Sequence, residues 1–329
     1  MMAWTVSDLG APQEALVMGE REKPTPSRTQ VLVRVRAAAV GYPDLMLSAG
    51  TYQLKPALPF VPGLEVAGEV VDCGAEVSGI ALGDRVCGLV ALPHGAFAEY
   101  AVLEAATTFP APPRLSNAEA SALTLAYQTA WFGLHHRAQL REGETLLVHA
   151  AAGGVGSAAV QLGALAGARV IASVGSQEKA DVPRQLGAAD IIGGRDADIA
   201  ARVLALTDGR GADCVFDPVG GDAYRRSTKC IAFEGRIVIV GFASGDIPAP
   251  SLGHALVKNY SILGLHWGLY ASTRPDETRR VHAALIDLAE AGRVTPLVSE
   301  IVSFEQVPEA IGRVASGRTT GRIVVGVQP

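Results

Sequence analysis

The sequence predicts an α/β protein of two domains, one a mostly antiparallel β domain and the other a doubly wound parallel sheet flanked by helices. Three observations predict it. The length of 329 residues is about twice that of a typical domain. The first third holds short apolar strands separated by glycine and proline turns, which is typical of antiparallel β structure. From Thr145 onward apolar strands alternate with helical patterns, which indicates parallel strands joined by helices.

The β domain is predicted from β-branched and alanine-rich runs that end at glycine turns. Prolines at positions 56, 59, 62, 110, 112 and 113 exclude long helices in this region. Short strands with frequent turns favour a small barrel or sandwich. The predicted strands are residues 31–40, 65–73 and 84–89.

The α/β domain follows a helical region that begins at Ser116, where Glu119 three residues later completes a capping box. The final segment has no place in the alternation, so we expect it to return to the first domain. The predicted helices are 117–140, 154–166, 177–186, 197–206, 223–231, 278–290 and 307–315, and the predicted strands are 145–150, 169–174, 190–192, 214–217, 236–240, 261–265 and 321–327.

Charge and cysteine usage exclude several classes of partner. Lys and Arg number 28 against 33 Asp and Glu, a net charge of −5 with no basic block, which argues against a nucleic-acid or anionic membrane surface. The N-terminus has no signal-peptide pattern. Four widely spaced cysteines argue against a disulfide framework and favour a reducing compartment, so we expect a cytoplasmic protein.

Residues 145–168 contain no charged side chain and are numerous enough to span a bilayer. They also contain His149, Ser157, Gln161 and five glycines, and their periodicity changes midway. A buried strand, a glycine turn and a buried helix explain this pattern better than a membrane span.

The glycine turn of this segment predicts a phosphate site. Gly153, Gly154 and Val155 lie where a helix starts after a strand, and the amide groups and positive dipole end of such a helix bind anions. Gly156 suits close packing of helix on strand. Ala151 replaces the first glycine of the usual dinucleotide fingerprint, so an ordinary glycine-rich turn is the alternative.

The end of the next strand predicts which dinucleotide binds. NAD sites place a carboxylate there for the ribose 2′-hydroxyl. Here Ser173, Gly175 and Ser176 provide none before Glu178, and Lys179 follows within reach. A small neutral pocket beside a cation fits a 2′-phosphate and therefore NADPH. A solvated surface role for Lys179 is the alternative.

Six motifs in this order resemble the medium-chain dehydrogenase/reductase superfamily, in its zinc-independent NADPH:quinone oxidoreductase branch. The resemblance covers essentially the whole chain. The motifs are LPFVPG at 58–63, EVAG at 65–68, GDRV at 83–86, GAFAEY at 95–100, HAAAGGVG at 149–156 and DPVGG at 217–221.

The resemblance implies a GroES-like catalytic domain, residues 1–122 and 266–329, and a Rossmann dinucleotide-binding domain, residues 123–265. It implies an active site in the cleft between them and a homodimer formed through the edge strand from Tyr260 to Leu265. An unpaired apolar edge strand is an aggregation hazard, which agrees with such a dimer.

The resemblance also implies the absence of a catalytic metal. Zinc-dependent members of the superfamily use a Cys and a His in two segments that correspond to residues 40–44 and 63–65, and neither residue type occurs there. A zinc site needs at least three protein ligands, so we predict none. Reduction of an electrophilic acceptor then needs only a positioned hydride donor.

Site residues carried over from the family fall into two groups. Asp44, Tyr52 and Tyr42 are the candidate catalytic residues, with Gly41 standing where the family pattern has Asn. Tyr52 as a covering loop aromatic and Asp44 as a helix N-cap are the alternatives. Arg318 matches a second phosphate-binding cation, although a tyrosine near that phosphate is replaced at Gly193 or Gly194. The remaining cofactor candidates are Thr129, Val219, Gly220, Gly241, Phe242, Ala243, His266 and Trp267.

We therefore expect an NADPH-dependent reductase that transfers hydride to a small electrophilic acceptor, most simply a quinone. Reduction of the C=C bond of an α,β-unsaturated ketone, aldehyde or acyl thioester is the enzymatic alternative. A catalytically idle NADPH-binding protein with a structural or regulatory role is the alternative of another class.

Overall fold

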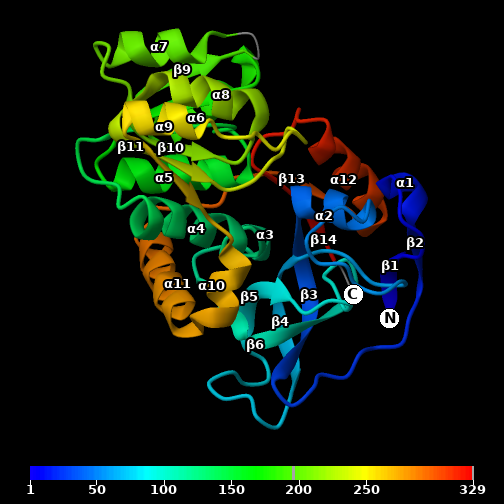
Figure 1. Ribbon diagram of the computed structural model, residues 1–329. Coiled ribbons are helices and arrows are strands. Elements are labelled where there is room, and N and C mark those ends of the chain that lie inside the picture. Colours follow the sequence, from blue (N-terminus) through cyan, green and yellow to red (C-terminus); the bar gives the residue numbers. More distant parts are fainter. Residues whose placement is uncertain (195–196, 328–329) are drawn as a thin grey trace. The chain divides into compact units, whose positions relative to one another are not determined.

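The computed structural model describes residues 1–194 and 197–327 and divides the chain into two compact units (Figure 1). The first unit comprises residues 1–125 and 270–329, and the second comprises residues 126–269.

The first unit is built on a six-stranded, largely antiparallel sheet that closes on itself. Strands follow the order β13-β14-β3-β4-β5-β6, and β3 also pairs with β6, which makes a barrel of β3 to β6. The C-terminal strand β14 pairs antiparallel with β3, so the end of the chain completes this unit. The bounds are β3 Gln30–Val40, β4 Glu65–Cys73, β5 Arg85–Val90, β6 Tyr100–Pro110, β13 Val298–Val302 and β14 Arg322–Gly326; a hairpin adds β1 Met2–Val6 and β2 Leu16–Glu20.

Helices of the first unit cover this sheet. Valines on the inner side of β3 and β14 share one buried core with Val307 and Ile311 of α12. Ser116 caps α3 as predicted, because its hydroxyl accepts the amide of Glu119. The bounds are α1 Pro12–Ala15, α2 Tyr42–Ser48, α3 Asn117–Ser121, α11 Pro275–Glu290 and α12 Val307–Ala315, with a 3₁₀ turn Phe304–Gln306.

The second unit is a parallel six-stranded sheet in the order β9-β8-β7-β10-β11-β12, which confirms the predicted doubly wound architecture. The order reverses between β7 and β10, and ligands of such sheets bind at the carboxyl ends of the strands flanking that reversal. The bounds are β7 Thr145–Val148, β8 Arg169–Val174, β9 Asp190–Gly193, β10 Ala212–Asp217, β11 Ile231–Ile239 and β12 Ser261–Gly264.

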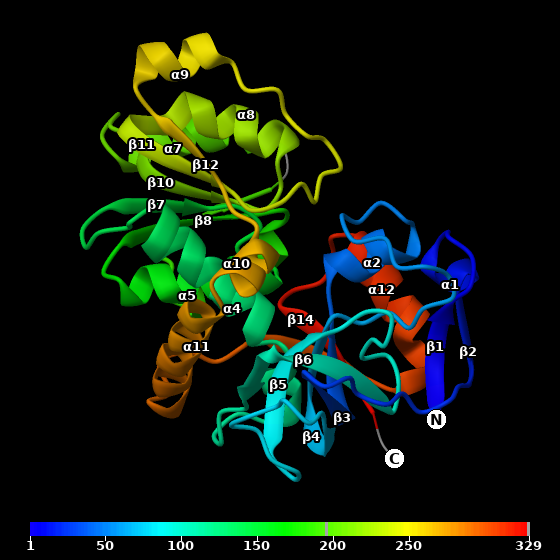
Figure 2. The same cartoon turned by 60° about the horizontal axis from the view of Figure 1, so that its bottom comes forward.

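Helices lie on both faces of the second sheet (Figure 2). In this view α5 lies below the sheet and α7, α8 and α9 lie above it. Val203 of α7 and Tyr224 of α8 join the apolar side chains of the strands in one core. The bounds are α4 Thr124–Trp131, α5 Gly154–Leu165, α6 Asp181–Gln185, α7 Ile199–Leu206, α8 Gly221–Cys230, α9 Leu252–Lys258 and α10 Trp267–Thr273.

Several predicted bounds were wrong. The helices expected over 117–140 are present as α3, α4 and a π-helix, Phe132–Arg137, but they end at 137, and the helix expected at 177–186 is a 3₁₀ turn, Gln177–Lys179, followed by α6. Strand β7 ends at Val148 because Ala150 turns into the left-handed region, with φ of 48°. Strands β6 and β13 and the short helices α1, α2, α9 and α10 had no prediction. None of the helices described is both long enough and apolar enough to cross a membrane.

Candidate functional site

The glycine turn between β7 and α5 brings its backbone close together and leaves the start of α5 uncapped. A Cβ atom added at Gly156 would lie 2.2 Å from the carbonyl oxygen of Ala150, so only glycine fits there. A Cβ atom at Gly153 would meet only that same oxygen, at 3.3 Å, and the space beyond is open. No side chain caps the first turn of α5, and that turn contains no acidic residue. Its amide groups are therefore available to an anion.

The end of β8 presents small side chains, as the sequence predicts. Ser173 is buried, and its carbonyl accepts the amide of Ala151, which ties this strand end to the glycine turn. Gly175 is exposed, and nothing lies within 4 Å of the position of a Cβ atom there. Ser176 precedes the 3₁₀ turn that carries Lys179. The end of β8 is therefore made of small residues and carries no carboxylate.

The loops after β10 and β11 lie against each other and bring five predicted cofactor residues together. The amide of Ala243 donates to the carbonyl of Pro218 over 3.1 Å, and the amide of Ser244 donates to the carbonyl of Val219 over 3.0 Å. A Cβ atom at Gly220 would lie 2.7 Å from the ring of Phe242. The two loops therefore form one surface, made by Val219, Gly220, Gly241, Phe242 and Ala243.

Three further cofactor candidates lie on α4 and at the start of α10. Thr129 is buried on α4. Trp267 is buried too, and its indole Nε1 donates to Gln128 Oε1 over 2.9 Å. His266 is exposed beside it. Gln128 therefore holds Trp267 in place, a role that no sequence motif indicates.

The candidate catalytic residues of the first unit surround α2. Asp44 is only 2% exposed and stands third in this helix, where its Oδ2 accepts the amide of Gly41 over 2.8 Å. Gly41, not Asp44, is the N-cap, so the predicted alternative of Asp44 as the N-cap is wrong. Tyr42 is the first residue of the helix and is half-buried. Tyr52 follows the helix and packs partly buried on the barrel core.

Sequence reasoning missed the charged neighbour of Asp44, Arg322, and the ion pair that Arg322 makes. Arg322, at the start of β14, forms an ion pair with Glu65 of β4, and its Nη1 donates to the carbonyl of Val40 over 3.3 Å. A Cβ atom at Gly41 would lie 2.7 Å from Arg322 Nη1, so the guanidinium occupies the space that a side chain at 41 would need. The one available signal was a charged residue at the first position of each of two largely apolar strands, β4 and β14.

Burial sets the protonation of this cluster. Removal from water raises the pKa of Asp44 to about 6, against the opposing effects of the Gly41 amide and of Arg322. Burial, and then the nearby Asp44 charge, raise the pKa of Tyr52. Asp44 Oδ1 and Arg322 Nε are buried without a hydrogen-bond partner among the described residues. Glu65 and Arg322 neutralise each other, so ionisation of Asp44 gives this cluster of three residues a net negative charge.

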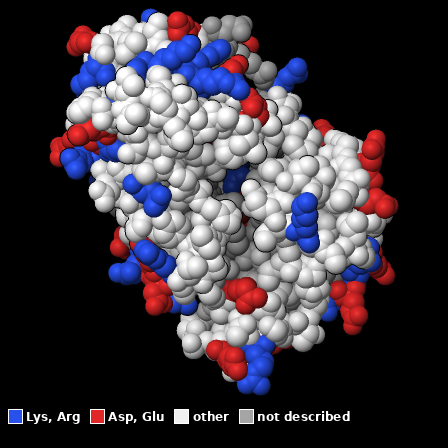
Figure 3. Space-filling model, viewed as in Figure 1, with Lys and Arg blue, Asp and Glu red and all other residues white. Residues whose placement is uncertain are grey.

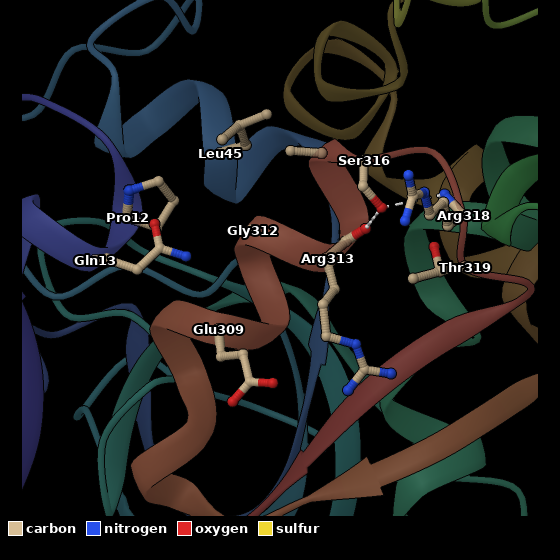
Figure 4. Close-up of a pocket in the computed structure, with 10 residues that line it drawn as sticks. Pro12, Gln13, Leu45, Glu309, Gly312, Arg313, Ser316, Arg318 and Thr319 are labelled. Atoms are coloured by element: carbon tan, nitrogen blue, oxygen red, sulfur yellow. Dashed lines mark hydrogen bonds between the residues drawn. The ribbon is translucent and has the colours of Figure 1, made fainter.

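Arg318, the predicted second phosphate-binding cation, lies on the rim of a cavity of about 640 Å³ in the first unit (Figure 4). Leu45 of α2, Gln13 of α1 and Arg313 of α12 contribute to the lining. Arg313 is paired with Glu300, whereas the Arg318 side chain is exposed.

Basic side chains gather over the helices of the second unit in the view of Figure 3. Arg225 of α8 is neutralised by Asp222 and Asp246, with N–O distances of 2.8 and 2.7 Å. Such exposed pairs contribute little to stability. Within the described residues, no group of three His, Cys, Asp or Glu side chains is arranged to hold a metal ion.

Two family models match the chain. One, described as an alcohol dehydrogenase GroES-like domain, matches residues 27–113, and the other, described as a zinc-binding dehydrogenase, matches residues 154–286. A quinone oxidoreductase-like protein 2 homolog of Nematostella vectensis is 38% identical over 302 residues, which are 91% of this chain and 82% of that protein.

Solved structures resemble the whole chain. A quinone oxidoreductase of Pseudomonas syringae pv. tomato matches with a TM-score of 0.92 and 32% identity over 99% of both chains. A mycobacterial protein complexed with NADPH matches with a TM-score of 0.92 and 28% identity over 99% of this chain and 100% of that one. The CurK enoyl reductase matches with a TM-score of 0.89 and 25% identity over 99% of both chains.

Proposed function

Because the chain belongs to the quinone oxidoreductase-like family of medium-chain dehydrogenase/reductases, we propose that it is a zinc-independent, NADPH-dependent reductase of quinones. The observation that carries the proposal is the N-terminus of α5, which no side chain caps and which Gly156 allows to pack closely on the preceding turn. The neighbouring strand β8 ends without a carboxylate. The first feature suits a diphosphate and the second suits a 2′-phosphate.

NADPH would be held by the glycine turn and by the end of β8. Ser173, Gly175, Ser176 and Lys179 would surround the adenosine ribose and its phosphate, and the loop surface formed by residues 219–220 and 241–243 would face the nicotinamide half. When bound, NADPH supplies a hydride. The NADPH complex of the mycobacterial relative supports this choice of cofactor.

The donor set at the family's metal position supports zinc independence. The side chains of Gly41 and Leu64 offer no ligand atom there, and the Arg322 guanidinium, which cannot bind a metal ion, fills the space beside Gly41. Polarisation of the acceptor is therefore assigned to protein hydrogen-bond donors.

Tyr52 is the proposed proton donor. Addition of one hydride and one proton converts a quinone to a hydroquinone, and Tyr52 would give its phenolic proton to the acceptor oxygen. Asp44 is too buried to touch substrate and would act on Tyr52 through its charge. Tyr42, half-buried at the start of α2, would line the same part of the site.

Steady-state oxidation of NADPH tests the proposal with a panel of a benzoquinone, a naphthoquinone, a cyclic enone and a crotonyl thioester. We expect turnover to be fastest with the quinones and unchanged by a chelator. The match to an enoyl reductase favours the C=C reductase as second candidate, and preference for the enone or thioester would establish it instead. Tight NADPH binding with no turnover on any acceptor would identify the idle binding protein.

We also propose a homodimer, which is supported by the edge strand β12 and by apolar side chains exposed on α9. Strand β12 pairs with β11 on one side, and α9, the helix that precedes it, exposes Leu252, Leu256 and Val257 by 77 to 79%. Pairing of two β12 strands would cover apolar surface of this kind. The four cysteines are free thiols, which supports a cytoplasmic location.

A further inference from the structure

Two buried polar residues lie at the reversal of strand order in the second unit. His149 follows β7 directly and Asp217 ends β10, and they are 2% and 0% exposed. The amide of His149 donates to the carbonyl of Phe216 over 3.1 Å, which continues the pairing of the two strands. Strands β7 and β10 are neighbours, and their following helices α5 and α8 lie on opposite faces (Figure 2). Both residues therefore stand at the edge where ligands of such sheets bind.

His149 is anchored to α8 by a hydrogen bond of defined direction. Its Nε2 lies 2.7 Å from Ser227 Oγ, and that hydroxyl lies 2.8 Å from the carbonyl of Ala223. A carbonyl can only accept, so the hydroxyl proton goes to Ala223 and Ser227 accepts from His149 Nε2–H. Burial lowers the pKa of His149, which favours the neutral imidazole, and the hydrogen bond to Ser227 assigns its one proton to Nε2.

Asp217 shapes the loop that follows β10. Its Oδ1 accepts the amides of Val219 and Gly220 over 2.8 and 2.9 Å, and Gly220 adopts φ of 69°. Its Oδ2 is buried without a hydrogen-bond partner among the described residues. An unsatisfied buried oxygen costs about 1–3 kcal/mol, and such costs concentrate at functional sites.

The residue after His149 is strained. Ala150 has φ of 48°, a conformation that costs a non-glycine residue roughly 1–2 kcal/mol. Its carbonyl accepts the amide of Gly153 over 2.8 Å, and its oxygen lies so close to Gly156 that no Cβ atom fits there. The shape of the glycine turn therefore depends on Ala150, the residue that directly follows His149.

We infer that His149 is a positioning residue that joins the glycine turn to the Asp217 loop. It would thereby fix the surface that binds the pyrophosphate relative to the surface that binds the nicotinamide. Ser227 holds its imidazole, and Asp217 holds the second loop. The inference rests on the proposed function, because it takes NADPH as the ligand. Within the described residues, the end of β8, which would bind the adenosine 2′-phosphate, has no hydrogen bond to His149, Ser227 or Asp217. It is joined to the glycine turn by the backbone hydrogen bond from Ala151 to Ser173.

Binding of two ligands of different length distinguishes a positioning role of His149 from a general contribution of His149 to the stability of the fold. We would measure by calorimetry the Kd for NADPH and the Kd for adenosine 2′-monophosphate, which lacks the pyrophosphate and nicotinamide. His149→Leu removes the donor and should weaken NADPH about tenfold while changing the shorter ligand less than about twofold. His149→Gln, whose Nε2 reproduces the lost donor, should recover most of the affinity.

Thr207→Val is the matched control. Thr207 is a buried hydroxyl at the end of α7, at the amino end of β10, and it accepts the amide of Gly211 over 2.9 Å. This variant should lower the thermal midpoint without changing either Kd. Equal weakening of both ligands by His149→Leu, or unchanged NADPH affinity, would overturn the inference.

If His149→Leu does not fold, Ser227→Ala decides by the same comparison, since it removes the acceptor of His149 together with the hydroxyl bond to Ala223 inside α8. A wild-type protein that binds no NADPH would instead refute the proposed function, so the two failures are distinguishable.

Discussion

Replacing Asp44 by Asn should make the protein more stable at neutral pH and leave its stability in acid almost unchanged. The carboxyl group of Asp44 is 2% exposed, one of its oxygens has no partner among the described residues, and its neighbours Glu65 and Arg322 already neutralise each other. Asn keeps the acceptor for the Gly41 amide and removes the buried charge.

The magnitude follows from the pKa of Asp44, which burial raises from 3.8 to about 6. The folded state therefore holds this proton more tightly than the unfolded state does. Below about pH 4 both states are protonated and the group contributes no difference. Between about pH 4 and 6 the unfolded state loses the proton first, so stability falls as the pH rises, and above about pH 6 the loss is complete. About two pKa units correspond to about 3 kcal/mol.

Urea unfolding followed by tryptophan fluorescence at several pH values between about 4 and 8 measures this difference. The gain in unfolding free energy of Asp44→Asn over wild type should grow from near zero to about 3 kcal/mol across that range. Asp8→Asn, at an exposed position, is the control and should show no such trend. A gain that does not vary with pH, or a variant less stable than wild type at neutral pH, would refute the reasoning.

Three further outcomes are expected. Lys179→Ala should raise the Kd for NADPH far more than that for NADH in a fluorescence titration, and equal losses would count against a 2′-phosphate site. Gly156→Ala should weaken NADPH at least about tenfold and lower the thermal midpoint by several degrees, because its Cβ would lie 2.2 Å from the oxygen of Ala150, whereas Gly153→Ala, with that oxygen at 3.3 Å, should be much milder. Leu256→Asp on the exposed face of α9 should convert a dimer to monomers in sedimentation experiments, and an unchanged mass would exclude this surface from the interface.

Local patterns sufficed for the elements whose signal lies within a few residues. Strands β4 and β8 and helix α12 have the predicted bounds, because a run of apolar side chains or a helical stripe of them is read directly from neighbouring positions. Strand β6 was missed because its eleven residues mix alanine, threonine and glutamate, and its order depends on pairing with both β3 and β5. The end of β7 was misplaced because Ala150 is left-handed, and its carbonyl fits only against a glycine at 156, six residues later.

The sequence by itself determined the architecture, and it also predicts where a cofactor would bind. Alternating strands and helices predict a parallel sheet, and the glycines at 153, 154 and 156 predict a phosphate site wherever the strand ends. These features are local, so spacing along the chain is enough to find them. Close packing of the helices on the parallel sheet also explains why a composition rich in alanine and poor in aromatic residues is sufficient to fill the core.

Only the tertiary structure decided which charges meet. Arg322 is far from Asp44 and Glu65 in the sequence, and it lies beside them because β14 pairs with β3. His149 meets Ser227, 78 residues later, because β7 and β10 are neighbours at the point where the strand order reverses. Buried polar groups must find partners or remain unsatisfied, and those partners are chosen by strand order and helix packing, which no single stretch of sequence contains.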